Sequence, residues 1–188
     1  MGLTDVLFGR KKLKGAAKDR LFALSTASVT LQMEGIKPGG AAAVVFKPLS
    51  AAEFVRAENE LQELLDKVAQ DSGSKVSRSS DEFGFEWLVV RDSELEDLVA
   101  TVHLIGDELQ ARGFGDRLLA AVFRFDGPEH PVYWVYGYKR GAFWPFVPTG
   151  KEKECDNAEE LDLKAKLENE LPIEKDLSAW FGLFDAPI

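Results

Sequence analysis

The sequence predicts an α+β fold in which amphipathic helices pack on an antiparallel sheet. Two long segments carry apolar residues at helical spacing, and the stretches between them have the pattern of short paired strands separated by turn residues. Strands joined by tight turns pair antiparallel, because parallel neighbours would need a crossover after each strand. The expected order of elements is about α-β-β-α-β-β-α-β-β-β-α, with one face of the sheet buried under the two long helices.

The first quarter of the chain is expected to hold one helix and two strands. Residues 17–32 have the pattern of a short helix that leads into a strand near Val29–Met33. Residues 36–40, IKPGG, are expected to form a loop, since Pro38 and two glycines resist both regular structures. The run AAAVVF that follows is predicted to be a buried strand.

Two amphipathic helices are predicted on either side of a hairpin. Ser50 with Glu53, and Ser93 with Glu96, have the spacing of a capping box, in which both side chains bond free backbone N–H groups of the first turn. Apolar residues at helical spacing follow each box: Phe54, Leu61, Leu64, Leu65 and Val68 in the first helix, and Leu95, Leu98, Val99, Val102, Ile105 and Leu109 in the second. Each segment ends at a glycine, which favours helix termination.

The remaining strands are predicted from alternation and turn signals. Residues 74–92 have the pattern of a hairpin, with apolar and other residues alternating from Phe83 to Val89. Residues 115–150 are expected to form three strands, joined by DGPEHP and by a tight turn at Lys139-Arg140-Gly141.

The C-terminal part, residues 151–188, is predicted to be an acidic helical segment. Asn157 with Glu160 form a third capping-box pattern, which opens a charged helix expected to run to about Leu171 before Pro172 halts it. The sequence DLSAWFGLF near the end is expected to form a last apolar turn or short helix.

Length and composition indicate one domain, residues 1–188, in a reducing compartment. An apolar content of 45% is enough for a core, and no apolar run approaches the roughly 20 residues that span a bilayer. Cys155 is the single cysteine, so the chain cannot form an intrachain disulfide or a cysteine-based zinc site. A cytoplasmic location is expected, since the N-terminus places its apolar residues before its charges, the reverse of a secretory signal.

The net charge of −9 is unevenly distributed. Residues 1–20 hold six basic and two acidic residues, whereas residues 151–188 hold eleven acids against five lysines. No basic stripe continues beyond the first 20 residues, so nucleic-acid binding is not expected. The basic N-terminal segment is instead a candidate for contact with an anionic membrane surface or an acidic partner, through Leu3, Val6, Leu7, Phe8, Arg10, Lys11, Lys12 and Lys14. The alternative is a solvated first helix.

The chain lacks the common catalytic motifs, and no catalytic residue, cofactor or metal site is predicted. It has no phosphate-binding glycine loop, dinucleotide fingerprint, zinc-protease motif or nucleophile elbow. His103 lies beside an apolar stripe, and His130 lies between turn residues. Cys155 lies among acids, which disfavour its thiolate. An enzyme that uses acids such as Glu82 or Asp126 near strand ends is the alternative.

The segment YKRGAFWPFVPTG, residues 138–150, is the strongest candidate for a binding surface. Pro145 removes a backbone donor, so its strand is expected to lie at a sheet edge or to carry a bulge. Aromatic residues point to both faces of this strand, so either the C-terminal helix covers the second face or the face is open for docking. The candidate partner-binding residues are Lys139, Arg140, Phe143, Trp144 and Phe146. Self-pairing of this edge in a homodimer is a further alternative.

Several segments together resemble the PspAB family, the phage-shock-protein-A-associated proteins of actinobacteria and archaea. They are MGLTDVLFGRKK, DRLFALSTASVTL, FGFEWLVVRD, GFGDRLLAAVFRF, KRGAFWPFVPTG and DLSAWFGLFDAP, which cover nearly the whole chain in order. The resemblance implies an envelope-stress role beside PspA-type coiled-coil proteins and often an HtpX-type membrane protease. It supplies no catalytic residues. The element order is also similar to type III secretion chaperone-like folds, a likeness of fold alone.

Taken together, the sequence favours a non-catalytic, cytoplasmic adaptor that binds another protein, with weak peripheral contact at the inner face of the membrane. The absence of catalytic motifs and the amphipathic surface of the aromatic hairpin are the observations behind this expectation.

Overall fold

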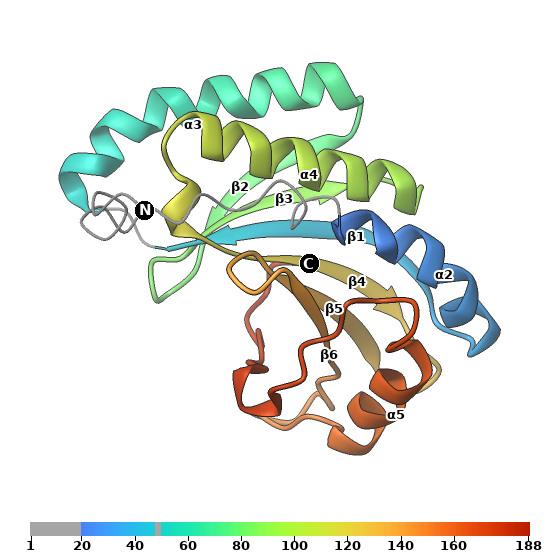
Figure 1. The fold of residues 1–188 in the computed structure, drawn as a ribbon. Helices are drawn as coiled ribbons and strands as arrows, with labels where there is room; N and C mark the ends of the chain where they lie inside the picture. The colour runs from blue at the N-terminus through green and yellow to red at the C-terminus, as the bar shows by residue number, and fades with distance from the viewer. Residues whose placement is uncertain (1–19, 48–49) are drawn as a thin grey trace, which may run out of the picture.

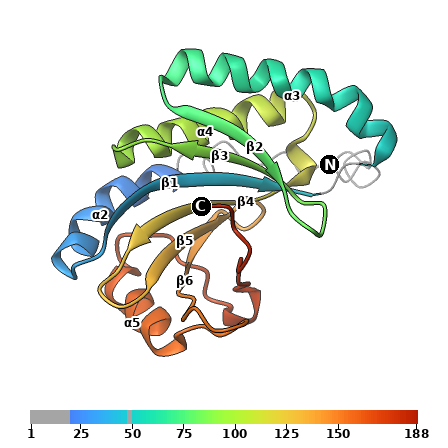
Figure 2. The ribbon, with the colours of Figure 1, turned by 180° about the vertical axis from the view of Figure 1, so that it is seen from behind.

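A six-stranded antiparallel sheet, in the order β2-β3-β1-β4-β5-β6, forms the centre of the molecule. The structure is a computed structural model and describes residues 20–47 and 50–188. Helices α2 (Ala23–Met33), α3 (Ala51–Ser72) and α4 (Leu95–Ala111) lie together on one side of the sheet (Figures 1 and 2). Helix α5 (Asn157–Leu167) and the C-terminal segment, residues 172–188, lie beyond β5 and β6. The predicted α+β class, with helices packed on an antiparallel sheet, is confirmed. The strands are β1 (Lys37–Phe46), β2 (Lys75–Ser80), β3 (Glu86–Arg91), β4 (Leu118–Asp126), β5 (Pro131–Gly137) and β6 (Ala142–Phe146).

The strand expected near Val29–Met33 is instead the end of helix α2 (Ala23–Met33), which follows a short 3₁₀ turn, η1 (Arg20–Phe22). Leu24, Ala27 and Leu31 are buried at helical spacing. Val29 and Met33, 63% and 83% exposed, lie on the opposite side of this helix. The prediction was wrong because local β-branched residues suggested a strand, whereas burial of the 24-27-31 stripe determines the helix.

The predicted loop at residues 36–40 is part of β1. The pairing of β1 with β4 shifts register between Pro38 and Ala42, so the glycines sit at a bulge within the strand. A Cβ on Gly39 would lie 2.9 Å from the Arg124 side chain, and Gly40 has a φ of +70°. Glycine therefore lets two strands approach here, where sequence alone suggested a break.

The two long helices are confirmed as α3 (Ala51–Ser72) and α4 (Leu95–Ala111). The capping box expected at Ser93 is not formed: Ser93 Oγ contacts the Glu94 side chain at 3.3 Å, and the Glu94 N–H donates to Asp92 at 3.1 Å. Helix α5 (Asn157–Leu167) also begins differently from the prediction. Asp156 is its N-cap and accepts from the Glu159 N–H at 3.0 Å, which leaves the Glu160 side chain free for another role.

The C-terminal segment, residues 172–188, covers part of the second face of the sheet, where side chains of β1, β3, β4, β5 and β6 form a second buried cluster. This segment is largely irregular and not the helical segment expected, and the charged helix ends at Leu167 and not near Leu171. The expected last apolar turn or short helix is present as one 3₁₀ turn, η3 (Leu177–Ala179). Tyr133 donates its hydroxyl hydrogen to the Ile188 carbonyl at 3.2 Å, and the Arg91 guanidinium reaches the Pro187 carbonyl at 3.5 Å. The last residues of the chain are thereby tied to β5 and β3.

Candidate functional site

Strand β6 lies at the edge of the sheet, as Pro145 predicts, and the C-terminal segment covers part of that edge. The Phe143 N–H donates to the Pro172 carbonyl, and the Glu174 N–H donates to the Phe143 carbonyl, both at 2.8 Å. The backbone of β6 is therefore already paired at Phe143. A second copy of the chain could not add a strand at this residue without displacing the C-terminal segment.

The three candidate aromatics of β6 are buried, with exposed fractions of 0% for Phe143, 1% for Trp144 and 2% for Phe146. Phe143 faces the helices and packs on Tyr136, whereas Trp144 and Phe146 face the other way. The expected alternation is confirmed, and of the two alternatives, burial rather than open docking is correct. The cover is the irregular C-terminal segment and not a helix.

The turn that precedes β6 has the predicted conformation. Gly141 has a φ of +64°, which glycine adopts without a Cβ penalty. Lys139 and Arg140 are both exposed, but Arg140 donates to the Glu174 carboxylate at 3.0 Å. The pKa of Glu174 is lowered, chiefly by the Asp176 N–H and further by Arg140. Arg140 therefore holds the C-terminal segment in place and is not a free cation for a partner.

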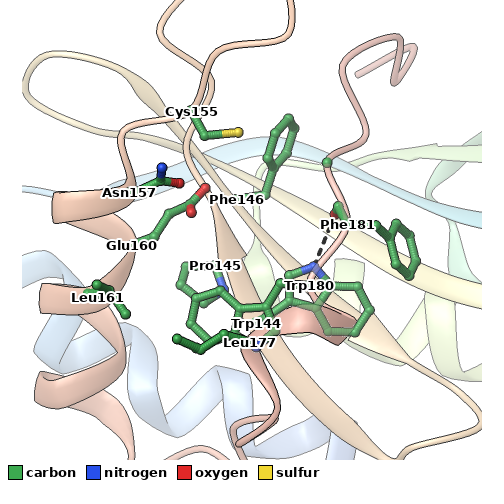
Figure 3. A pocket seen from close by; sticks show the side chains of 11 residues that line it. Trp144, Pro145, Phe146, Cys155, Asn157, Glu160, Leu161, Leu177, Trp180 and Phe181 are labelled. Carbon is green, nitrogen blue, oxygen red and sulfur yellow. Dashed lines mark hydrogen bonds between the residues drawn. The ribbon is translucent and has the colours of Figure 1, made fainter.

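A pocket of about 230 Å³ lies between β6, α5 and the C-terminal segment (Figure 3). Trp144, Pro145 and Phe146 of β6 contribute to its lining, with α5 on one side and the C-terminal segment on the other. Three large apolar side chains at this pocket remain nearly half exposed: Leu161 at 47%, Leu177 at 49% and Phe181 at 43%. We call these three residues, with the pocket that they line, the apolar groove.

The sequence predicted the β6 residues that line the apolar groove, but not the residues of α5 and the C-terminal segment that line its other side. Leu161 is out of phase with the inward-facing residues of α5, which are Glu160, Leu163 and Leu167. An apolar residue off the buried stripe was a signal that could have been noticed. Phe181 and Leu177 lie in a segment whose path over the sheet has no local signature.

Glu160 is the buried charged group at the apolar groove, with only 8% of its surface exposed. Its carboxylate accepts the Val147 N–H at 2.9 Å. Burial raises the pKa of Glu160, and the Val147 bond partly offsets that increase. Among the lysine, arginine and histidine side chains that the structure describes, none forms an ion pair with this carboxylate.

Cys155 also lines the pocket and is partly buried. Its pKa is raised, first by burial and then by the charge of Glu160. The predicted disfavouring of the thiolate is confirmed in direction. Its main causes are burial and a carboxylate five residues away, not the adjacent acids in the sequence.

The other candidate catalytic groups lie apart from the apolar groove. His103 Nδ1 lies 3.5 Å from an Asp107 carboxylate oxygen on α4, and its ring lies 5.0 Å from that of Phe22. Asp126 contacts Arg124 at 3.3 Å, and Glu82 is exposed at the β2–β3 turn. None of them lines the pocket that holds Glu160 and Cys155.

The predicted membrane-contact residues, from Leu3 to Lys14, lie outside the residues that the structure describes. Among the helices that it does describe, none is both long enough and apolar enough to span a bilayer. No cluster of three or more potential metal ligands occurs in those same residues.

Comparison with known proteins gives one match. A sequence model of the family described as PspA associated protein B matches residues 1–188, so the resemblance to that family is confirmed. No curated protein and no solved structure matches the chain. The likeness to type III secretion chaperone folds therefore stays a prediction.

Proposed function

Because the chain belongs to the PspA associated protein B family, we propose that it is a non-catalytic adaptor that binds a PspA-type protein through the apolar groove. The family description supports the choice of partner. The proposal places the interaction in the cytoplasm, where a lone cysteine stays reduced. The basic N-terminal segment would hold the complex near the inner face of the membrane. An HtpX-type membrane protease is the second partner to test.

The observation that carries this proposal is the convergence of exposed apolar side chains on one pocket. Leu161, Leu177 and Phe181 come from two segments and stand nearly half exposed around buried aromatic rings. Single exposed apolar residues are common, but a group that surrounds a concavity is typical of interaction sites. The geometry suits a protruding side chain from a partner, because anchors that fill pockets contribute most of the energy of protein interfaces.

The thiol at the apolar groove is not activated for nucleophilic catalysis. Glu160 and Cys155 both have raised pKa values, chiefly because of burial. A thiol whose pKa is raised is a weak nucleophile at neutral pH, because the thiolate is the reactive form. Phe146 and Leu161 beside these two groups offer contact surface and no proton-transfer group.

The test is a binding measurement between the purified full chain and the purified PspA-type protein from the same genome. We expect saturable binding by calorimetry, and a loss of at least about tenfold in affinity for the double variant Leu161→Ser with Phe181→Ser. The matched control is Val29→Ser with Met33→Ser, which removes two exposed apolar side chains from the outer side of α2. The control should bind as the wild type does.

Three results would overturn the proposal. The first is no binding of the PspA-type protein by the wild type at about 100 µM, and the second is equal affinity for wild type and groove variant. The third is an equal loss in the α2 control, which would indicate a general effect of surface apolar residues. Sedimentation of each variant alone checks whether the apolar groove instead joins two copies of this chain.

A further inference from the structure

The buried carboxylate of Glu160 is the starting point for a more specific inference about the apolar groove. It lies 8% exposed on the pocket wall with the Val147 N–H as a donor at 2.9 Å, and the Cys155 thiol lines the same pocket. Removing a carboxylate from water is unfavourable unless a cation or several donors replace the water. Because none of the described basic residues pairs with it, the site is electrostatically incomplete within the described chain.

Aromatic rings border the same pocket, and their polar edges are already satisfied. The Trp144 indole N–H donates to the Phe181 carbonyl at 3.2 Å, and the Trp180 indole N–H donates to the Glu174 carbonyl at 3.1 Å. Trp180 is partly exposed and therefore offers the pocket π surface with no free donor, whereas Trp144, only 1% exposed, is part of the core. A cation close to the face of a tryptophan is attracted by the ring quadrupole.

The segment that contributes Cys155, Asn157, Glu160 and Leu161 to the pocket is acidic, which also favours a basic ligand. Residues 151–162 contain six acids and two lysines. One of the two lysines, Lys151, forms an ion pair with Glu154 at 3.3 Å, so its charge is partly neutralised within the segment. An excess of negative charge beside an apolar groove steers basic ligands toward it.

We propose that the pocket receives one basic side chain, an arginine, from the bound protein partner. Its aliphatic stem would lie along Leu161 and Leu177, and its guanidinium would meet the Glu160 carboxylate beside the Trp180 ring. Arginine suits the site better than lysine, because a planar guanidinium can stack on an aromatic ring and donate two bonds to one carboxylate. This inference rests on the proposed function, since it identifies which feature of the partner enters the apolar groove.

The test uses two small probes that differ only in charge. N-acetyl-arginine methylamide and N-acetyl-citrulline methylamide are titrated into the full chain at constant ionic strength, up to tens of millimolar. The readout is the ¹⁵N–¹H signal of each indole: Trp144 and Trp180 report on the pocket, whereas Trp87 and Trp134 lie outside its lining and serve as internal references. We expect saturable shifts at Trp144 and Trp180 only, with the arginine probe bound at least about tenfold more tightly than the citrulline probe.

The variant Glu160→Gln isolates the charge, because a glutamine oxygen can still accept the Val147 N–H. It should lower the affinity for the arginine probe by about tenfold and leave the citrulline probe unchanged. Trp180→Leu, which keeps the carboxylate and removes one ring, should lower arginine affinity by about two- to fivefold. Glu152→Gln, an exposed acid of the same segment, is the matched control and should have little effect.

The proposal is overturned if both probes bind equally, if Glu160→Gln binds arginine as the wild type does, or if the wild type shows no saturable shift. Should Glu160→Gln fail to fold, Trp180→Leu with the two probes decides the question. These outcomes can be distinguished from those of the adaptor proposal. If the Leu161 and Phe181 double variant loses binding of the PspA-type partner, the apolar groove is the binding site. If Glu160→Gln then binds the arginine probe as the wild type does, only the arginine pocket is rejected.

Discussion

Replacing Trp144 with alanine tests whether the β6 rings are structural residues beneath the C-terminal segment. Trp144 is 1% exposed, and its ring lies 4.8 Å from that of Phe181 at an angle of 64°. Its indole N–H donates to the Phe181 carbonyl at 3.2 Å. Truncation of a buried aromatic to alanine costs about 3–5 kcal/mol. Loss of the indole bond is expected to put the effect in the upper half of that range, because the Phe181 carbonyl loses its donor.

The assay is urea denaturation of wild type, Trp144→Ala, Phe181→Ala and the double variant, followed by circular dichroism. Phe181 is 43% exposed, so its own truncation should cost only about 1 kcal/mol. The edge-to-face pair should appear as a coupling energy of about 0.5–1.5 kcal/mol in the double-mutant cycle. A cost below about 1 kcal/mol for Trp144→Ala, or no coupling to Phe181, would refute the burial of Trp144 under the C-terminal segment.

Three further changes test other parts of the structure. Tyr138→Phe should raise the free energy of unfolding by about 1 kcal/mol in urea, because the Tyr138 hydroxyl is buried without a hydrogen-bond partner among the described residues; a loss of stability would contradict this. The folded chain holds the Glu160 proton more tightly than the unfolded chain does, so stability should fall as pH rises from the ordinary value of 4.5 through the raised pKa. Glu160→Gln should remove that part of the slope in pH-dependent unfolding, and an unchanged slope would refute the assignment. Deleting residues 1–14 should reduce sedimentation with anionic vesicles, and equal sedimentation would end the membrane proposal.

The sequence predicted best those parts of the fold whose apolar residues recur at regular spacing or whose ends are marked by turn residues. Helices α3 and α4 carry continuous apolar stripes, and the antiparallel strands follow from turns that glycine or proline mark. The errors occurred where a distant contact outweighed a local preference. Val29–Met33 has strand-like residues, but the buried Leu24 and Leu31 fix it as helix. Pro38 to Gly40 resembles a loop until β4 pairs with it.

Distant contacts also determine the apolar groove, which was therefore harder to predict from the sequence than the helices were. Alternation of Phe143, Trp144 and Phe146 placed their rings on opposite faces correctly, but not the cover over the second face. That cover depends on the Phe143 hydrogen bonds to Pro172 and Glu174 and on the Arg140–Glu174 ion pair, which join segments about thirty residues apart. An irregular segment has no periodic pattern from which such pairing could be predicted.

The candidate site therefore depends on how the C-terminal segment lies on the sheet. Trp144 and Phe146 are core residues, and the same contacts that bury them, ring to ring with Phe181 and Phe184, hold Phe181 at the edge of the pocket. Gly182 allows this close approach, because a Cβ there would lie 2.6 Å from the Phe184 ring and 3.0 Å from the Phe146 ring. A change that detached the segment would expose the β6 rings and dismantle one wall of the pocket together. Stability of the C-terminal segment and affinity for a partner should thus vary together among variants at this face, whereas substitution of the exposed α2 residues Val29 and Met33 should leave both unchanged.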